Sequence, residues 1–529
     1  MSSQRRTSGS AVTDDVTITH IDVDKDQIRL SDGRVIEHRS SSRKRTPQAG
    51  PSANLRTDPI ARFNLILNNP DSYGLLDHIT VGTGPDGGSP GVYPRQLFSV
   101  IYALQNAVAS QSAISQALKF DCYLPILMQM LTAALPTVPP DDRVRIQKWL
   151  HTPSIPSPSR ISRMFRTLEE RGAHQQDALR EQGVRLSVED GRFSRANGIY
   201  SQKNRIVGDG SAFKAATSHP GGQVVDLVTG EIRQRRTDDA AQTHVEGGEN
   251  TVYGTKFAMI WSIGPHRHDT IALGASYVNS PSPQKEVDIA ITLTQGVQEE
   301  LKLHNAAASL LAYDRAAGRK EQEALNNIGM VLATRAIMDQ APDDSSHYRK
   351  AKFIGTTTPA CGHENSFFAI SKRLHHGGTD VEGNTTYIPL PHIQRPKRTG
   401  ERNFHYTEHT YTCWCSPTTT QVLRISWNGR KAALALSKNG ITLAGDKGYD
   451  NMLRYLQPHA PDGDEFKEIN GTRQRAEAMH SIIDNMLPFK RLQRWSLESK
   501  QAWVFGYLTG HNLVHQQLRR EHIPDALAS

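Results

Sequence analysis

The order of apolar patterns after Arg205 constrains the fold of this 529-residue chain more than any other feature of its sequence. Short β-rich runs bounded by Gly and Pro predict strands at RIVGDGSAFKA, QVVDLVTGEIRQR, KFAMIWSIG and IALGASYV. The amphipathic helix EVDIAITLTQGVQEELKLH follows, then the apolar run SLLAYD, the helical GRKEQEALNN and the strand-like GMVLATRAI. Because a strand, a crossover helix and a strand favour parallel pairing, this order predicts an α/β fold with a mixed sheet.

Composition divides the chain into five segments. Residues 1–55 are polar and basic, and we expect a disordered arm with one weak hairpin around VTITHIDVDKDQIRLSDGRVIE. Residues 56–200 place apolar side chains three or four apart, which predicts a helical domain suited to DNA binding. Residues 201–342 contain the predicted sheet, residues 343–445 are short strands among Pro and Gly turns and predict a β-rich insertion, and residues 446–529 are helical and basic.

Charge and hydropathy limit the class of protein. The net charge of +8 favours contact with a polyanion but does not identify one. No stretch approaches the roughly 20 uninterrupted apolar residues of a membrane-spanning helix, and the N-terminus lacks the apolar run of a signal peptide. We therefore expect a protein of the bacterial cytoplasm, associated with the nucleoid.

One helix of the N-terminal region carries a regular basic pattern. The segment PSPSRISRMFRTLEER begins with Pro and Ser, which suit a helix start, and sets Arg160, Arg163 and Arg166 at steps of three along one face. Such a face fits a DNA groove as the second helix of a helix-turn-helix, and a solvated basic face is the alternative.

The C-terminal segment PFKRLQRWSLESKQAWVFGYL mixes basic and aromatic residues. We predict phosphate contacts for Lys490, Arg491 and Arg494. The aromatics Trp503 and Phe505 are predicted to be core residues.

Three carboxylates lie at or near the ends of predicted strands or on a late predicted helix. Asp209 follows the strand RIV with a Gly on each side, an arrangement that lets backbone and ligand come close. Asp314 ends the run SLLAY, and Glu477 lies on a late helix that opens with Arg473 and Arg475. Carboxylates in such a group hold two divalent cations, which activate a water or 3′ hydroxyl and stabilise the leaving oxygen at phosphorus.

Each carboxylate also has a simpler explanation. An Asp beside Gly is common in turns, and a Glu on a basic helix often pairs with a neighbouring Arg. The appearance of all three in this order on these elements favours the catalytic interpretation.

These elements resemble the RNase H-like, retroviral integrase-like core of bacterial insertion-sequence DDE transposases, in a divergent form with a β-rich insertion before the glutamate helix. The resemblance rests on VGDGS, LLAYDRAAGR and GTRQRAEAMHSIIDNML and covers roughly Arg205 to Leu518. It implies that Asp209, Asp314 and Glu477 are the catalytic, metal-binding acids.

The same resemblance implies further properties. Arg473 matches the basic residue of the signature around the glutamate and is predicted to contact DNA, whereas Asn470 and Asp484 replace the Tyr and Lys of that signature. Two Mg²⁺ ions, which Mn²⁺ can replace, are the implied cofactors. The implied activity is cleavage and strand transfer of the double-stranded ends of the element's own DNA into a target, by a homo-oligomer.

Asp446 is a rival for the second aspartate. It lies in ITLAGDKGYDN, which resembles the D-x-G-Y motif of other insertion-sequence families. We favour Asp314 because an amphipathic helix precedes its strand and another helix and strand follow it.

A second group of candidate ligands lies in the β-rich region. Cys361 and His363 form a C-x-H pair, and Cys413 and Cys415 form C-x-C about fifty residues later. Together they suit a structural zinc ion, although the spacing differs from that of zinc ribbons and fingers, and free cysteines near strands are the alternative. Four further histidines are alternative metal ligands: His375, His376, His405 and His409. Cys122, in the apolar run KFDCYLPILM, is predicted to be a core residue.

Two other functions remain open at this stage. A catalytically silent DNA-binding protein derived from a transposase would bind DNA without cutting it. An RNase H-like nuclease or resolvase would cut DNA without joining it. The intact set of acids favours the transposase.

Overall fold

The structure is a computed structural model. The chain forms two compact units, Met1–Gly50 and Pro51–Ser529. The residues that the structure describes are 18–22, 27–30, 35–37, 58–76, 93–217, 223–225, 229–234, 238–246, 250–265, 269–280, 282–313, 319–334, 351–359, 361–370, 372–379, 383–395, 397–399, 402–428, 441–459, 464–487 and 490–526.

The N-terminal unit contains a small antiparallel sheet in the order β1-β2-β3. Its strands are β1 (Ile18–Asp22), β2 (Gln27–Leu30) and β3 (Val35–Glu37). The sequence predicted a hairpin here, and the structure adds a third strand. The rest of the arm that we expected to be disordered lies outside the described residues.

Residues 58–76 and 93–190 form a helical region, as the apolar periodicity predicts. Its first helix begins where Asp58 accepts hydrogen bonds from the backbone N–H groups of Ile60 and Ala61, with Pro59 at the first helical position. The α-helices are α2 (Pro59–Leu67), α3 (Arg95–Ala103), α4 (Gln111–Ala117), α5 (Tyr123–Ala134), α6 (Pro140–His151), α7 (Pro158–Glu169) and α8 (Gly172–Glu189).

The α/β region is built on a mixed sheet in the order β11-β10-β4-β8-β7, with β9 also paired to β8. β4 runs antiparallel to β8 and parallel to β10, which is in turn parallel to β11. The parallel pairing predicted from the strand, helix and strand order is thus confirmed. The strands are β4 (Arg205–Lys214), β7 (Gln242–Glu246), β8 (Asn250–Ile263), β9 (Thr270–Tyr277), β10 (Leu310–Tyr313) and β11 (Val331–Thr334).

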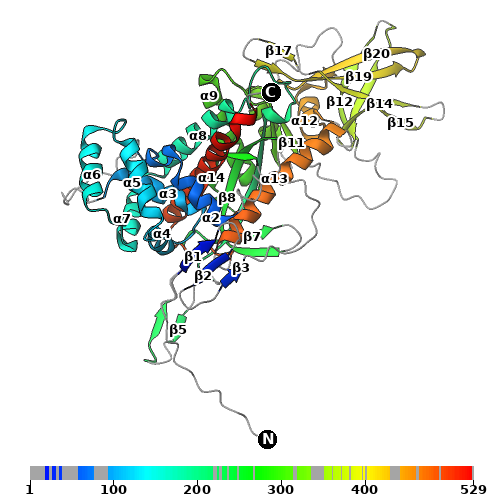
Figure 1. Cartoon of the computed structure of the whole chain (residues 1–529). Coiled ribbons are helices and arrows are strands. Elements are labelled where there is room, and N and C mark those ends of the chain that lie inside the picture. The colour runs from blue at the N-terminus through cyan, green and yellow to red at the C-terminus, as the bar shows by residue number, and fades with distance from the viewer. Residues whose placement is uncertain are drawn as a thin grey trace. The chain divides into compact units, whose positions relative to one another are not determined.

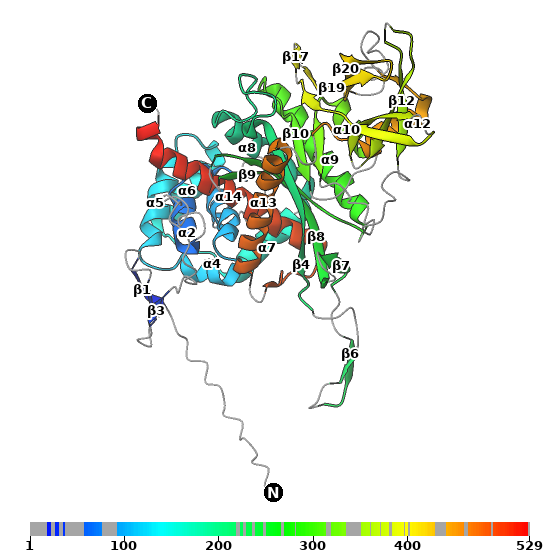
Figure 2. The same ribbon diagram turned by 90° about the vertical axis from the view of Figure 1, so that its right-hand side faces the viewer.

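Helices cover both faces of this sheet, as strands that are apolar on both sides require. The crossover helices α9 (Pro283–Leu303) and α10 (Arg319–Asn327) connect β9 to β10 and β10 to β11. Ile206 belongs to the apolar cluster under α9, whereas its neighbour Val207 belongs to the cluster that includes α13. Figure 1 and Figure 2 show α13 (Asp464–Met486), in orange, beside the strands.

One predicted strand is placed differently. The run QVVDLVTGEIRQR contains a separate hairpin of β5 (Gln223–Val225) and β6 (Ile232–Gln234). Val225 and Ile232 are 52% and 65% exposed, so this hairpin does not bury its apolar residues in the core. The extra strand of the sheet is β7, which the sequence pattern did not reveal.

Between β11 and α13 the described chain is mostly β-structure, in two main sheets with the orders β15-β14-β13-β12-β21 and β16-β19-β20. Helix α12 (Gly445–Tyr455) packs on the first of these sheets. The strands are β12 (Lys352–Thr357), β13 (Asn365–Ile370), β14 (Arg373–Thr379), β15 (Thr385–Pro389), β16 (His392–Gln394), β17 (Lys397–Thr399), β18 (Arg402–Phe404), β19 (Tyr406–Cys413), β20 (Ser416–Ser426) and β21 (Thr442–Leu443).

The C-terminal helix α14 (Leu497–Ala526) binds the outer strand of the sheet and the helical region. The amide of Asn512 accepts from the N–H of Ala272 on β9 at 2.8 Å and donates to its carbonyl at 3.0 Å. These two bonds satisfy backbone groups of a strand that would otherwise present an open edge. Within the described residues, no helix combines the length and apolarity needed to cross a membrane.

Two helical glycines provide a test of this packing. A Cβ on Gly183 of α8 would overlap the carbonyl of Ala272 on β9, whereas a Cβ on Gly471 of α13 would meet nothing within 4 Å. We expect Gly183→Ala to lower the free energy of unfolding by about 1–3 kcal/mol, the cost of overpacking. Gly471→Ala should raise it by up to about 1 kcal/mol through helix propensity.

Urea denaturation of both variants measures these changes. Equal stabilisation by the two substitutions would contradict the close approach of α8 to β9.

A candidate acidic site on the central strand

Asp209 lies near the middle of β4, the strand between β10 and β8. The glycines beside it are required by packing on the opposite face of the sheet. A Cβ on Gly208 would lie 2.9 Å from the ring of Tyr313, and one on Gly210 would overlap the carboxyl of Glu286. The sequence interpretation assigned these glycines to close approach of a ligand, and the structure supplies side-chain packing as the reason instead.

Helix α13 presents three polar side chains to Asp209, at positions i, i+4 and i+7 of one helix face. Arg473 Nη2 contacts Glu477 Oε1 at 2.8 Å. His480 Nδ1 lies 3.6 Å from Asp209 Oδ2. The Glu477 side chain is 48% exposed, whereas Arg473 is only 2% exposed. Glu477 is therefore the solvent-facing acid of the group.

The environment of Asp209 disfavours its charged form. Burial raises its pKa, and the negative charges of Glu286 and Glu477 raise it further. The positive charge of Arg473 and the N–H of Gly210, which donates to Asp209 at 3.0 Å, act in the opposite direction. The net result is a pKa of about 7. Such a carboxyl is stabilised by a cation that approaches it.

His480 is neutral at ordinary pH. Burial and the positive charge of Lys256 lower its pKa to about 3. It therefore faces Asp209 as an uncharged imidazole, and the 3.6 Å approach is not an ion pair. Its Nε2 is buried with no hydrogen-bond partner among the described residues.

A buried ion pair lies beneath Gly210 on the opposite face of the sheet. Lys256 Nζ contacts Glu286 Oε2 at 2.8 Å, and the Tyr313 hydroxyl donates to Glu286 Oε1 at 2.9 Å. Both charged side chains are less than 10% exposed. The pair fixes β8 to α9 and places charges of both signs close to Asp209.

The two candidates for the second aspartate have different positions. Asp314 follows Tyr313, the last residue of β10, and lies outside the described residues. Asp446 is exposed in the first turn of α12, which packs mainly on β12, whereas α13 packs on β4. The structure thus places Glu477 on the helix that packs against the strand of Asp209, whereas Asp446 lies on α12.

The predicted basic face of α7 is accessible. Arg160, Arg163 and Arg166 are all exposed. The opposite face is buried against the helical region by Ile161, Met164, Phe165 and Leu168. The basic face is therefore free of packing against the rest of the described chain.

The basic residues before α14 differ in placement. Lys490 is exposed, Arg491 donates to the carbonyl of Ala215 at 3.0 Å, and burial lowers the pKa of Arg494. Trp503 and Phe505 are each 1% exposed, which confirms them as core. Arg473, predicted to contact DNA, is buried and bonded to Glu477.

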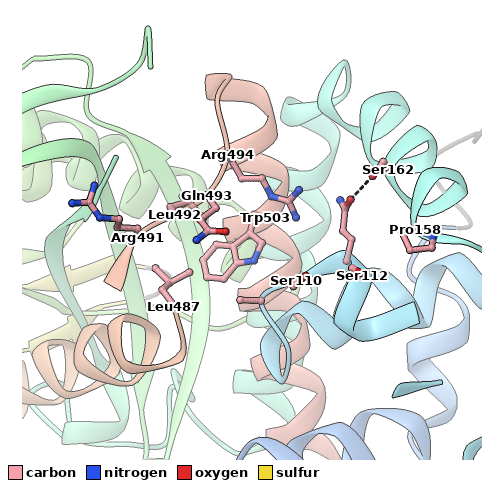
Figure 3. A pocket seen from close by; sticks show the side chains of 12 residues that line it. Ser110, Ser112, Pro158, Ser162, Leu487, Arg491, Leu492, Gln493, Arg494 and Trp503 are labelled. Atoms are coloured by element: carbon pink, nitrogen blue, oxygen red, sulfur yellow. Dashed lines mark hydrogen bonds between the residues drawn. The ribbon is translucent and has the colours of Figure 1, made fainter. Parts of the chain in front are cut away.

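A pocket of about 250 Å³ lies where this segment meets the helical region. Figure 3 shows Arg494 beside Trp503, near Ser110 of the loop before α4, while Arg491 points away. Gln111 and Ser162, joined by a 2.7 Å hydrogen bond, connect α4 with α7 on the other side. The pocket is thus lined by a mixture of polar, cationic and apolar groups close to the basic helix.

The cysteine and histidine candidates come together although their spacing differs from that of zinc ribbons and fingers. The ligand atoms of Cys361, His363, Cys413 and Cys415 all lie within 4.8 Å of one another, an arrangement that could hold a metal ion. Burial raises the pKa of Cys413, but hydrogen bonds from Cys415 and Asn365 lower it overall to about 7.

The remaining cysteine, Cys122, and two of the other candidate histidines lie outside this cluster. Cys122 is exposed, so its prediction as a core residue is wrong. It lies just before α5, whose buried residues are on a different face. His376 Nε2 donates to the side-chain oxygen of Asn365, and His405 contacts the carbonyl of Gly329, so these rings have other roles.

A further acidic group, Asp190, Asp269 and His515, also has ligand atoms within 4.8 Å of one another. Arg192 contacts both carboxylates, at 3.0 and 2.6 Å, and Arg519 also bonds Asp190. The arginines already balance the negative charge, so we interpret this group as an ion-pair network that joins α8 to α14.

Sequence reasoning did not identify Glu286, Lys256 or His480 as part of the site. Nothing in an amphipathic helix or a strand marks a residue whose partner lies on a distant element. Only the three-residue step from Glu477 to His480 could have indicated a shared helix face.

Comparison of the sequence with models of known protein families finds no matching family, and comparison with curated proteins finds no match either. The geometry of the site therefore carries the functional argument.

The raised pKa of Asp209 predicts a pH-dependent gain in stability for Asp209→Asn in metal-free protein. Ionisation in the folded state carries a cost that the amide avoids. The gain should be absent below about pH 4, grow as the pH rises to about 7 and then level off. With one pKa unit worth about 1.4 kcal/mol, its upper limit is on the order of 4 kcal/mol.

Urea denaturation between pH 5 and pH 8 in the presence of a chelator measures this gain. Asp121→Asn, at an exposed position, is the control and should show no comparable trend. A loss of stability at pH 8 in Asp209→Asn would show that the carboxylate is stabilised by its surroundings.

Proposed function

We propose that this protein is a DNA transposase of the DDE type, in which Asp209, Asp314 and Glu477 hold divalent cations that serve cleavage and strand transfer of DNA ends. The observation that carries the proposal is the approach of α13 to β4. It brings Glu477 close enough to Asp209 for its charge to raise the pKa of that carboxyl.

The fold is consistent with the proposal. The chain orders its sheet as the antiparallel strands β4, β8 and β9, with β7 as an additional strand before β8, then α9, β10, α10 and β11, and the glutamate helix α13 comes late in the sequence. The resemblance to the RNase H-like core predicts this order of strands and helices. β10 lies directly beside β4 and runs parallel to it, and the proposal assigns Asp314, the residue after β10 in the sequence, as the second acid.

The residues at the site fit hard divalent cations. Asp209 is a largely shielded carboxyl, 18% exposed, near other negative charges, and Glu477 is partly exposed, so a cation would relieve repulsion between them. Oxygen ligands of this kind are those preferred by Mg²⁺, and Mn²⁺ can replace it. When bound, the ions would activate the attacking water or 3′ hydroxyl and stabilise the leaving oxygen.

The surrounding side chains have positioning roles in this proposal. Arg473 holds the Glu477 carboxylate through a charge-assisted hydrogen bond, which fixes the acid on its helix face. The neutral imidazole of His480 fills the space beside Asp209 without neutralising it. The Lys256 and Glu286 pair supports the strand from below.

Two surfaces are proposed to contact the phosphates of double-stranded DNA. One is the exposed basic face of α7, and the other comprises Lys490 and the pocket beside Arg494. Transposases pair two DNA ends, so the proposal includes a homo-oligomer that holds the terminal repeats and the target.

The proposal predicts loss of DNA cleavage in acid variants. Asp209→Asn and Glu477→Gln should each lower the rate of Mg²⁺-dependent cleavage by at least about a hundredfold, because each removes a group that acts on charge in the transition state. The assay uses DNA that carries the inverted repeats flanking the coding region. Asp314→Asn should match these losses and Asp446→Asn should not.

Glu465→Gln is the matched control, since Glu465 is exposed on the same helix. Retention of Mg²⁺-dependent cleavage by Asp209→Asn would refute the assignment. Products in which a DNA end is joined to target DNA distinguish a transposase from a nuclease or resolvase. DNA binding without cleavage, in the wild type as well as in the variants, would indicate the silent, transposase-derived alternative.

The basic face of α7 predicts a salt-dependent loss of DNA affinity. Combined replacement of Arg160, Arg163 and Arg166 by Ala should weaken binding and reduce the slope of log affinity against log salt by about one for each lost phosphate contact. Fluorescence anisotropy at several salt concentrations measures both quantities.

Arg143→Ala with Lys148→Ala on α6 provides the control, because both side chains are exposed on a neighbouring helix. An equal loss per removed charge on the two helices would indicate general electrostatic attraction and contradict a specific role for α7.

A further inference from the structure

The group that the acidic site leaves unexplained is the cluster of three thiols and one imidazole in the β-rich region. Cys361 and His363 lie in the loop just before β13, and Cys413 and Cys415 lie at the tip of the β19–β20 hairpin. About fifty residues separate the two pairs in sequence, yet their ligand atoms lie within 4.8 Å of one another.

The distances suit one tetrahedral ion. Cys413 Sγ lies 3.5 Å from Cys361 Sγ and 3.2 Å from Cys415 Sγ. For Zn–S bonds of about 2.3 Å, two sulfurs on a tetrahedral zinc ion lie about 3.8 Å apart. Small outward adjustments of the thiols would therefore accommodate the ion without movement of the strands.

The backbone at both pairs is shaped to present the ligands. Gly362, between Cys361 and His363, has φ +78°, a conformation that a side chain disfavours, and its N–H donates to the carbonyl of Pro359. At the hairpin, Cys413 pairs with Ser416, so Trp414 and Cys415 form a two-residue turn. Each turn places two ligands on one side of a tight bend.

A buried amide supports the central sulfur. Asn365 is 1% exposed, and its Nδ2 donates to Cys413 Sγ at 3.5 Å and to the carbonyl of His363 at 2.9 Å. The Asn365 oxygen is in turn bonded to His376 Nε2 at 2.9 Å. Donors that orient the first ligands are typical of metal sites, because they favour the thiolate and fix its direction.

Aromatic packing holds the two sheets together behind the cluster. Phe367 on β13 packs edge-on against Tyr411 on β19, with ring centroids 5.1 Å apart. His376 on β14 packs on Trp414, between the cysteines of the hairpin, at 5.0 Å. These contacts join the sheet beside Cys361 and His363 to the hairpin that carries Cys413 and Cys415.

From this convergence we infer that Cys361, His363, Cys413 and Cys415 bind one zinc ion that joins the β13 loop to the β19–β20 hairpin. Three thiolates and an imidazole form a closed donor set with no position left for water, which is the arrangement of a structural rather than a catalytic zinc site. A disulfide would use two of the sulfurs and leave the third thiol and the imidazole without a role. The ion would cross-link the two sheets of the β-rich region.

Metal analysis of the full-length, tag-free protein, purified without chelators, tests the inference. We expect about one zinc per chain in the wild type and a loss of most of it in Cys413→Ser and Cys415→Ser. Cys122→Ser is the matched control, because Cys122 is an exposed cysteine outside the group, and it should retain the zinc.

Cobalt reconstitution of the wild type keeps the test independent of how the variants fold. Cobalt should produce thiolate-to-metal charge-transfer bands and the intense d–d bands of tetrahedral coordination. Absence of those bands, zinc that is unchanged in both hairpin variants, or a disulfide between Cys361 and Cys413 in the wild-type protein as purified without chelators would each overturn the inference. None of these outcomes depends on DNA cleavage, so a failure here leaves the proposed transposase activity untouched.

Discussion

The candidate site is organised around one carboxyl, that of Asp209, on the strand between β10 and β8. Asp209 faces α13 while the glycines on either side of it admit Tyr313, Glu286 and Lys256 from the other face. A buried acid near two other acids is costly, and its pKa of about 7 expresses that cost. Proteins retain such an arrangement where a bound cation or a reaction uses it, so this electrostatic cost is the physical basis for the proposed activity.

One face of the sheet supports the strand of Asp209, and the other face carries the candidate site. The α9 face is packed with apolar side chains and contains a buried ion pair, which fixes the position of β4. The α13 face carries Arg473, Glu477 and His480 on successive turns, and Glu477 alone is substantially exposed. A site must hold its ligands in place while substrate enters. The fixed strand β4 and the partly exposed face of α13 meet these two requirements.

Much of the fold was predictable because it depends on local periodicity. The crossover helix α9 and the strands β4, β8, β9, β10 and β11 follow from patterns that any apolar sheet between helices must show. The exceptions have physical causes. The β5–β6 hairpin has strand-like residues but leaves Val225 and Ile232 exposed, and Cys122 lies in an apolar run whose buried face excludes it. Residue type alone does not reveal which side of an element is covered.

The sequence by itself determined the candidates: the acids on their elements, the basic steps on α7 and the two cysteine pairs. It did so because spacing along a helix or strand fixes which side chains share a face. Tertiary structure alone decided that Arg473 is a buried partner of Glu477, that Glu286 and His480 surround Asp209, and that four thiol and imidazole groups meet at one point. Contacts between elements far apart in the chain arise from packing of whole surfaces, and no local pattern encodes them.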